Sequence, residues 1–104
     1  AMNFASLKAV ALYDQLTYQL SNTRPGDAKM AETLETLKEA HATMAGLKAH
    51  CTWTTLEAIE QCRQACGGQG YSSYTGLASL YQDFAVQCTW EGDNTVLTLQ
   101  TGRY

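Results

Sequence analysis

The longest uninterrupted helical pattern runs from residue 28 to residue 66, and it contains no proline. Its apolar residues recur mostly at steps of three and four positions, the spacing that places side chains on one face of an α-helix. The members of this stripe are Met30, Leu34, Leu37, Met44, Leu47, Cys51, Ala58, Ile59, Cys62 and Cys66. A single element of this length dominates a short chain, so a helical protein is predicted.

Two places could bend this helix, and one must end it. Gly46 and the β-branched threonines within residues 51–55 weaken helix propensity, which leaves a kink open there. No residue at either place forces a stop, so one long helix is preferred. Gly67 and Gly68 do force one, and they are expected to provide a left-handed C-cap within a GGQGY loop.

A second helix is predicted upstream over residues 3–20, which lack glycine and proline. Its apolar face would consist of Phe4, Leu7, Val10, Leu12, Leu16 and Leu20. Residues 21–27 break the pattern, because Pro25-Gly26 is a strong turn signal and Asp27 is a plausible N-cap. The connection is short, so the two helices are expected to lie antiparallel.

Two smaller helices are predicted downstream. Residues 72–76 read as a loop with N-cap residues, and a helix of two to three turns follows, with Leu77, Leu80, Tyr81 and Phe84 on its inner face. Residues 86–90 are expected to be extended or irregular, and residues 93–95 to cap a terminal helix. No run alternates with the period of a strand. The predicted fold is an all-α helical bundle with two long antiparallel helices, a short helix and a terminal helix.

Length and charge restrict the remaining possibilities. At 104 residues the chain is predicted to form a single helical domain. A domain of this size buries little surface, so homo-oligomerisation is expected. The net charge is −3 and the basic residues are scattered, which gives no support for nucleic-acid binding. No apolar run is long enough for a membrane span, and the first residues do not resemble a signal peptide.

The cysteines and histidines do not form a metal-binding pattern. Cys62 and Cys66 are one helical turn apart, which is not the spacing of a zinc site, and packing as small reduced apolar side chains is preferred over a disulfide or a metal. His41 and His50 each stand alone, and structural roles are expected for both. Reduced cysteines favour an intracellular protein.

The second half of the chain carries motifs that occur together in one known family. QACGGQGY is followed, some twenty residues later, by CTWEGDNTVL and then LQTGRY. This combination resembles the C-terminal helical region of the acyl-CoA oxidases, which are flavoenzymes of the acyl-CoA dehydrogenase superfamily. The resemblance covers nearly the whole chain but only a fraction of the family's length. It implies that the chain is part of the C-terminal α-domain of a larger flavoenzyme.

The resemblance also implies an activity and a set of site residues. In that family the glutamate of the Trp-Glu-Gly turn removes the α-proton of a fatty acyl-CoA, and a hydride passes to FAD. The product is trans-2-enoyl-CoA, and O2 is then reduced to hydrogen peroxide. Glu91 matches this base and Gly92 the neighbouring position that lets the acyl chain pass. The residues that match FAD contacts are Gln64, Ala65, Cys66, Gly67, Gly68, Asp93, Asn94 and Thr95. The first five of these often contact the FAD of a neighbouring subunit.

Alternatives remain open at this point. The chain by itself is interpreted as inactive and without bound FAD, because the family needs further domains, and it could be a non-catalytic helical interaction module. An acyl-CoA dehydrogenase is another alternative, although dehydrogenases usually carry EGT where this chain has EGDN. Peroxisomal localisation is implied by the family alone.

Overall fold

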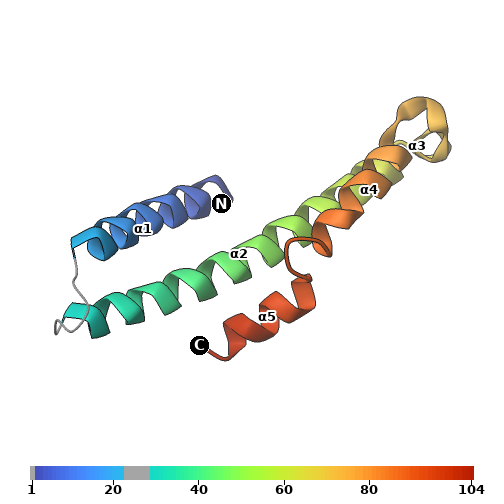
Figure 1. Cartoon of the computed structure of the whole chain (residues 1–104). Coiled ribbons are helices and arrows are strands. Elements are labelled where there is room, and N and C mark those ends of the chain that lie inside the picture. Colours follow the sequence, from blue (N-terminus) through green and yellow to red (C-terminus); the bar gives the residue numbers. More distant parts are fainter. Residues whose placement is uncertain (1, 23–28) are drawn as a thin grey trace. The chain divides into compact units, whose positions relative to one another are not determined.

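The computed structural model describes residues 2–22 and 29–104, and every regular element within these residues is helical (Figure 1). The all-α prediction is therefore confirmed. The predicted turn at Pro25 and the predicted cap at Asp27 lie outside the described residues. The α-helices are α1 Met2–Asn22, α2 Lys29–Ala65, α3 Gly68–Tyr71, α4 Leu77–Ala85 and α5 Asn94–Gly102, and short 3-10 helices span Ser73–Thr75 and Val86–Cys88.

Helix α2 is continuous, as the sequence predicts. It is not interrupted at Gly46 or within residues 51–55, where a kink was considered. The hydroxyl of Thr52 donates to the carbonyl of Lys48 at 2.9 Å, and that of Thr54 donates to the carbonyl of His50 at 2.7 Å. A threonine that bonds back to the preceding turn satisfies its own hydroxyl without interrupting the helix. The threonines in this stretch are therefore compatible with an unbroken helix.

The end of α2 differs in detail from the prediction. Gly67 has a positive φ of 58°, but its ψ of −141° lies outside the left-handed helical region, so the expected left-handed C-cap is wrong. The following residues form the one-turn helix α3 instead of an open loop. Gly70 is buried within it, and a Cβ at this position would collide with the carbonyl oxygen of Arg63. Only glycine allows the backbone to approach α2 this closely.

The described chain divides into two compact units, which we name the hairpin unit, residues 1–47 with 98–104, and the turn unit, residues 48–97. In the hairpin unit, α1 lies antiparallel beside the first half of α2 (Figure 1). Its buried residues are mostly small: Leu16, Thr33, Ala40, Ala42 and Ala45. The predicted stripe was partly wrong here, because Leu34 and Leu37 are exposed. The alanines, which allow close helix approach, form the inner face instead.

In the turn unit, α4 runs back along the second half of α2 (Figure 1). Leu77, Tyr81 and Phe84 are partly buried, as predicted for its inner face, whereas Leu80 is exposed. The segment after α4, expected to be extended or irregular, is not extended: it continues as a 3-10 turn over Val86–Cys88, followed by turn residues. This turn and the residues after it lead the chain into α5.

Candidate functional site: the Glu91 turn and the glycine-rich stretch

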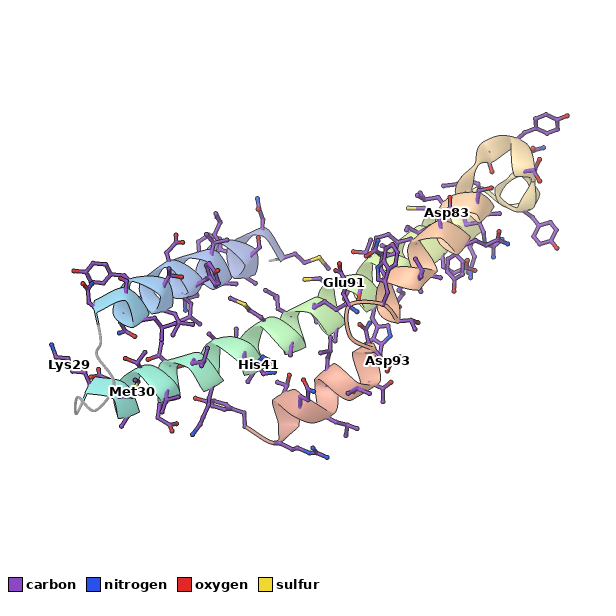
Figure 2. The ribbon with its side chains drawn as sticks, viewed as in Figure 1. Lys29, Met30, His41, Asp83, Glu91 and Asp93 are labelled. Carbon is purple, nitrogen blue, oxygen red and sulfur yellow. The ribbon has the colours of Figure 1, made fainter. Side chains whose placement is uncertain are left out.

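Glu91 lies in the turn between the 3-10 segment and α5, with its side chain exposed (Figure 2). Its φ is 54°, and within the described residues it is the one non-glycine residue with a positive φ. A residue with a Cβ in this conformation costs about 1–2 kcal/mol. The turn therefore presents a carboxylate to solvent from a strained backbone, a feature found often at functional sites.

Gly92 is required next to Glu91 for two reasons. Its φ is 106°, a backbone conformation that residues with a Cβ rarely adopt. A Cβ built on Gly92 would also lie 3.0 Å from Cδ2 of Leu97, closer than a van der Waals contact. The missing side chain thus makes room for Leu97 of α5, a local packing role that the sequence did not indicate.

Asp93 caps α5, as predicted. Its Oδ1 accepts hydrogen bonds from the backbone N–H groups of Thr95 at 2.9 Å and Val96 at 3.4 Å. These two N–H groups at the start of α5 are thus bound within the chain by the Asp93 carboxylate.

Asn94 is the most buried side chain of the turn unit, with 1% of its surface exposed. Its Oδ1 accepts a hydrogen bond from Nζ of Lys48 at 2.8 Å, and its Nδ2 donates to Oγ1 of Thr52 at 2.8 Å and to the carbonyl of Ala49 at 3.4 Å. Lys48 also donates to the carbonyl oxygen of Gly92 at 2.7 Å. Asn94 therefore points into the protein. Sequence reasoning missed Lys48 and Thr52, and their one-turn spacing on α2 was the only signal for them.

The second group of predicted site residues, Gln64 to Gly68, lies exposed where α2 ends and α3 begins. A Cβ built on Gly67 or on Gly68 would meet no atom within 4 Å, so the backbone is open to close approach. Gln64 is held at its side chain, because Nε2 donates to Oε1 of Glu60 at 2.8 Å. The stretch therefore offers an accessible backbone next to a fixed amide.

A charged pair stabilises the helix just before this stretch. The guanidinium of Arg63 donates two hydrogen bonds to the carboxylate of Glu60, at 2.6 and 2.7 Å. These bonds, together with the one from Gln64, lower the pKa of Glu60 to about 2. The pair is partly exposed, with 24% of the Arg63 side chain and 32% of the Glu60 side chain accessible, so solvent weakens its contribution to stability.

The two groups of predicted site residues do not meet within the turn unit. The Glu91 turn is hydrogen-bonded to α2 at Lys48, whereas the glycine-rich stretch follows Ala65 at the end of the same helix. At 1.5 Å per residue, the helix between these points spans about 26 Å. Helix α4, nine residues long, runs back along α2 from the glycine-rich stretch, and with the 3-10 turn that follows it leads the chain to the Glu91 turn.

The cysteines only partly follow the packing prediction. All four are free thiols, and Cys51 and Cys88 are partly buried, but Cys62 and Cys66 are exposed. Cys62 lies on α2 near its end, and Cys66 directly follows the helix. Among the described residues, no cluster of three or more histidine, cysteine or carboxylate side chains is arranged to hold a metal ion.

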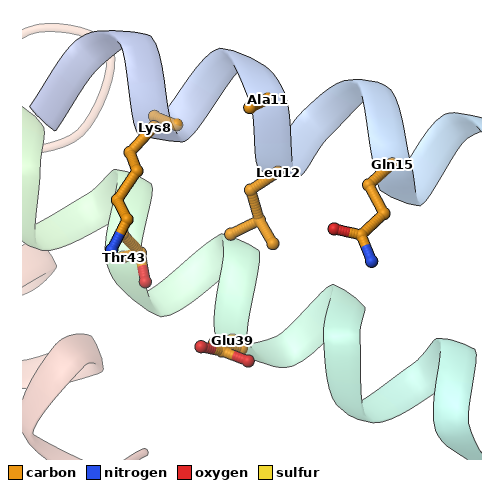
Figure 3. Close-up of a pocket in the computed structure, with 7 residues that line it drawn as sticks. Lys8, Ala11, Leu12, Gln15, Glu39 and Thr43 are labelled. Atoms are coloured by element: carbon orange, nitrogen blue, oxygen red, sulfur yellow. The ribbon is translucent and has the colours of Figure 1, made fainter. Parts of the chain in front are cut away.

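A surface groove of about 410 Å³ lies between α1 and α2 in the hairpin unit (Figure 3). Its lining residues are Lys8, Ala9, Ala11, Leu12, Gln15, Glu39 and Thr43. None of them is a predicted site residue, so the groove shares no residue with the candidate site. No helix in the described part of the chain combines the length and the apolar character needed to cross a bilayer.

The described chain is thus all-helical, with a strained glutamate turn directly before a helix start. Residues 1–104 match the family described as "Acyl-CoA oxidase, C-alpha1 domain". The chain therefore belongs to this family, and the resemblance noted in the sequence is confirmed.

Relatives and solved structures agree with this assignment. The chain is 50% identical to acyl-coenzyme A oxidase 3 of Yarrowia lipolytica over 99% of its own length and 15% of the relative's. It is 48% identical to peroxisomal acyl-coenzyme A oxidase 1 of Bos taurus over 91% of this chain and 14% of that protein. The crystal structure of acyl-CoA oxidase 3 from Yarrowia lipolytica superimposes with a TM-score of 0.79 at 46% identity, covering 95% of this chain and 14% of that one. The chain thus spans about 15% of the length of these relatives.

Proposed function

We propose that this chain supplies the catalytic base and part of the FAD site of an acyl-CoA oxidase. The reaction converts a fatty acyl-CoA and O2 into trans-2-enoyl-CoA and hydrogen peroxide. The observation that carries the proposal is the conformation of Glu91. In a member of this family, an exposed carboxylate is held at a φ of 54° directly before a helix start.

Glu91 acts as the general base in this proposal. Its carboxylate takes the α-proton of the thioester, and the electron pair left at the α-carbon forms the new double bond as the β-hydrogen leaves as hydride. Bound FAD would supply the acceptor for that hydride and the route of the electrons to O2. A positioned carboxylate is needed because thioester α-protons are weakly acidic and transfer fast only to a base within hydrogen-bond reach.

The residues proposed to contact FAD fit this role unequally. Gly67 and Gly68 have open backbones that a cofactor can approach closely, and Thr95 is exposed beside the Glu91 turn. Asn94 is turned inward and bound by Lys48 and Thr52, so its role is to shape the turn. Asp93 is occupied in capping α5.

The separation of the two groups of residues favours an oligomer. About 26 Å of helix lies between the Glu91 turn and the stretch from Gln64 to Gly68. We infer that the glycine-rich stretch serves the FAD of a second subunit, while Glu91 serves its own. Large apolar side chains on α1 support further association, with Phe4 81%, Leu7 64% and Val10 59% exposed. The names of relatives such as the bovine enzyme favour a peroxisomal location.

The test is a Glu91→Gln substitution in the intact enzyme that contains this region. The amide keeps the shape of the side chain but does not accept the proton, so we expect flavin reduction by acyl-CoA to slow by roughly 10²–10⁴-fold or more. Anaerobic bleaching of the flavin measures this, and bound FAD should stay at the parental level. Glu57→Gln, an exposed glutamate on α2, is the matched control. Bleaching of the Glu91→Gln variant at the parental rate would show that Glu91 is not the base.

The second candidate function, a non-catalytic interaction module, rests on the same exposed apolar residues of α1. Purified alone, the chain would then associate without binding FAD. Sedimentation together with flavin absorbance separates the alternatives. A monomer that contains no FAD would count against both the interaction module and the association that we infer.

A further inference from the structure

A lysine outside the predicted site binds the turn that carries Glu91. Nζ of Lys48, on α2, donates to the carbonyl oxygen of Gly92 at 2.7 Å and to Oδ1 of Asn94 at 2.8 Å. Gly92 and Asn94 stand on either side of the capping residue Asp93. One ammonium group therefore fixes both sides of the short segment between Glu91 and α5.

We call the Lys48 ammonium group, with its bonds to Gly92 and Asn94, the anchor. Further hydrogen bonds connect Asn94 back to the main chain of Lys48. Nδ2 of Asn94 donates to Oγ1 of Thr52 at 2.8 Å, and the Thr52 hydroxyl donates to the carbonyl oxygen of Lys48 at 2.9 Å. The hydrogen bonds thus lead from Lys48 through Asn94 and Thr52 back to the main chain of Lys48. Asn94 is 1% exposed, and hydrogen bonds shielded from water in this way are strengthened.

The charge of Lys48 is directed at neutral acceptors. Within residues 2–22 and 29–104, the ion pairs join Lys38 to Glu35 and Arg63 to Glu60, and neither involves Lys48. Hydrogen bonds from an ammonium group are stronger than those between neutral groups. The anchor therefore holds the Gly92 carbonyl more firmly than a neutral side chain would.

The turn needs such an anchor because its backbone is strained. Glu91 has a φ of 54° and Gly92 a φ of 106°. Conformations of this kind persist only where the surroundings fix them. We propose that Lys48 is a positioning residue for Glu91, holding the strained turn so that the carboxylate meets the α-carbon of the substrate. This inference rests on the proposed function of Glu91 as the base.

The experiment compares Lys48→Met with the parental enzyme in the intact protein that contains this region. Methionine keeps the length of the side chain but has no ammonium group. We expect the limiting rate of flavin reduction under anaerobic conditions to fall about 10- to 100-fold, since small misplacements of a catalytic group have effects of this size. The KM for acyl-CoA and the FAD content should stay within about twofold of the parental values, because the Lys48 ammonium group bonds to the Gly92 carbonyl and to the inward-facing Asn94 side chain rather than to a ligand.

A measurement without substrate tests the anchor directly. Hydrogen exchange of the amides at residues 89–95 should accelerate about tenfold or more in Lys48→Met, while exchange at the end of α2 stays unchanged. Lys48→Arg keeps a charged donor, so it should restore part of the rate of flavin reduction and part of the protection from exchange at residues 89–95. Lys38→Met is the matched control, because Lys38 lies on the same helix in an exposed pair with Glu35 and should change neither reading. If Lys48→Met fails to fold, Lys48→Gln takes its place with the same expectations.

Three results would overturn the inference. Unchanged exchange at residues 89–95 would show that Lys48 does not hold the turn. A parental rate despite faster exchange would show that the anchor does not position the base, and a raised KM at an unchanged rate would assign Lys48 to substrate binding. Failure of the proposed function itself is distinguishable, because Glu91→Gln would then bleach its flavin at the parental rate, whatever the Lys48 variants show in hydrogen exchange.

Discussion

The hairpin unit and the turn unit are stabilised in different ways. In the hairpin unit the buried residues are Leu16 and a row of alanines, and the one buried polar side chain among its described residues, Thr33, bonds back to its own helix at 2.9 Å. In the turn unit the most buried side chain is Asn94, which bonds to Lys48 and Thr52 of another helix. The hairpin unit is held mainly by close contact of small side chains, with one hydrogen bond from the Thr101 hydroxyl to the Ala42 carbonyl at 3.1 Å, whereas the turn unit has a buried network of hydrogen bonds around Asn94.

This difference matches what each unit has to do. Packing of apolar surfaces has little directional preference, so it can hold two helices together without fixing any single side chain precisely. Hydrogen bonds fix both distance and angle. The turn that carries the candidate base is held by hydrogen bonds, and the hairpin unit needs only to bring helices together. The two units should therefore respond differently to changes of polarity and of volume.

The largest effect is expected for Asn94→Leu, which changes polarity at nearly constant volume. The substitution removes the hydrogen bonds of Asn94 to Lys48, Thr52 and the Ala49 carbonyl, and a hydrogen bond of this kind contributes about 0.5–1.5 kcal/mol, so we expect a loss of roughly 2–3 kcal/mol in the free energy of unfolding. Urea denaturation of the purified chain measures it. Gln82→Leu, an exposed amide on α4, is the control and should stay within about 0.5 kcal/mol of the parent. Equal effects of the two substitutions would refute the hydrogen-bonded description of the turn unit.

A smaller effect is expected for Ala40→Leu in the hairpin unit. Ala40 is 2% exposed, and a larger side chain there forces the helices apart, at a cost of roughly 1–2 kcal/mol. Ala40→Ser changes polarity with little change of volume, and its hydroxyl can bond to the preceding turn as Thr33 does, so it should cost less. Urea denaturation of both variants gives the comparison. A serine that destabilises more than leucine would contradict the view that volume dominates in this unit.

The smallest effect concerns Glu60 and depends on pH. Its pKa is about 2 when folded, below the ordinary value of 4.5, because Arg63 and then Gln64 bond to the carboxylate. The pair therefore stabilises the folded chain above about pH 4.5, and this contribution is lost as the pH falls toward 2. Thermal unfolding of Glu60→Gln and the parent should differ slightly at neutral pH, and the difference should disappear near pH 2. If the difference in thermal stability between the parent and Glu60→Gln grew as the pH fell, the lowered pKa of Glu60 would not stabilise the folded chain as described.

Much of the helical framework followed from local sequence. Residues at three- and four-position steps define α1, α2 and α4, and the cap at Asp93 follows from a side chain that reaches the next turn of its own helix. The family assignment also came from local motifs around Glu91 and Gly67, which the comparison with known acyl-CoA oxidases confirms. These features depend on neighbours close in sequence, and periodicity and motif spacing record such neighbours directly.

What the sequence did not show depends on contacts between distant segments. The inward orientation of Asn94, the anchor at Lys48 and the need for glycine beside Leu97 appear only when α5 and its preceding turn are placed against α2. The separation of the Glu91 turn from the glycine-rich stretch depends likewise on the direction of α4 along α2. Local sequence therefore determined which residues form helices and which carboxylate is the candidate base. Tertiary structure decided what holds that carboxylate, because the hydrogen bonds that fix the turn join residues more than forty positions apart.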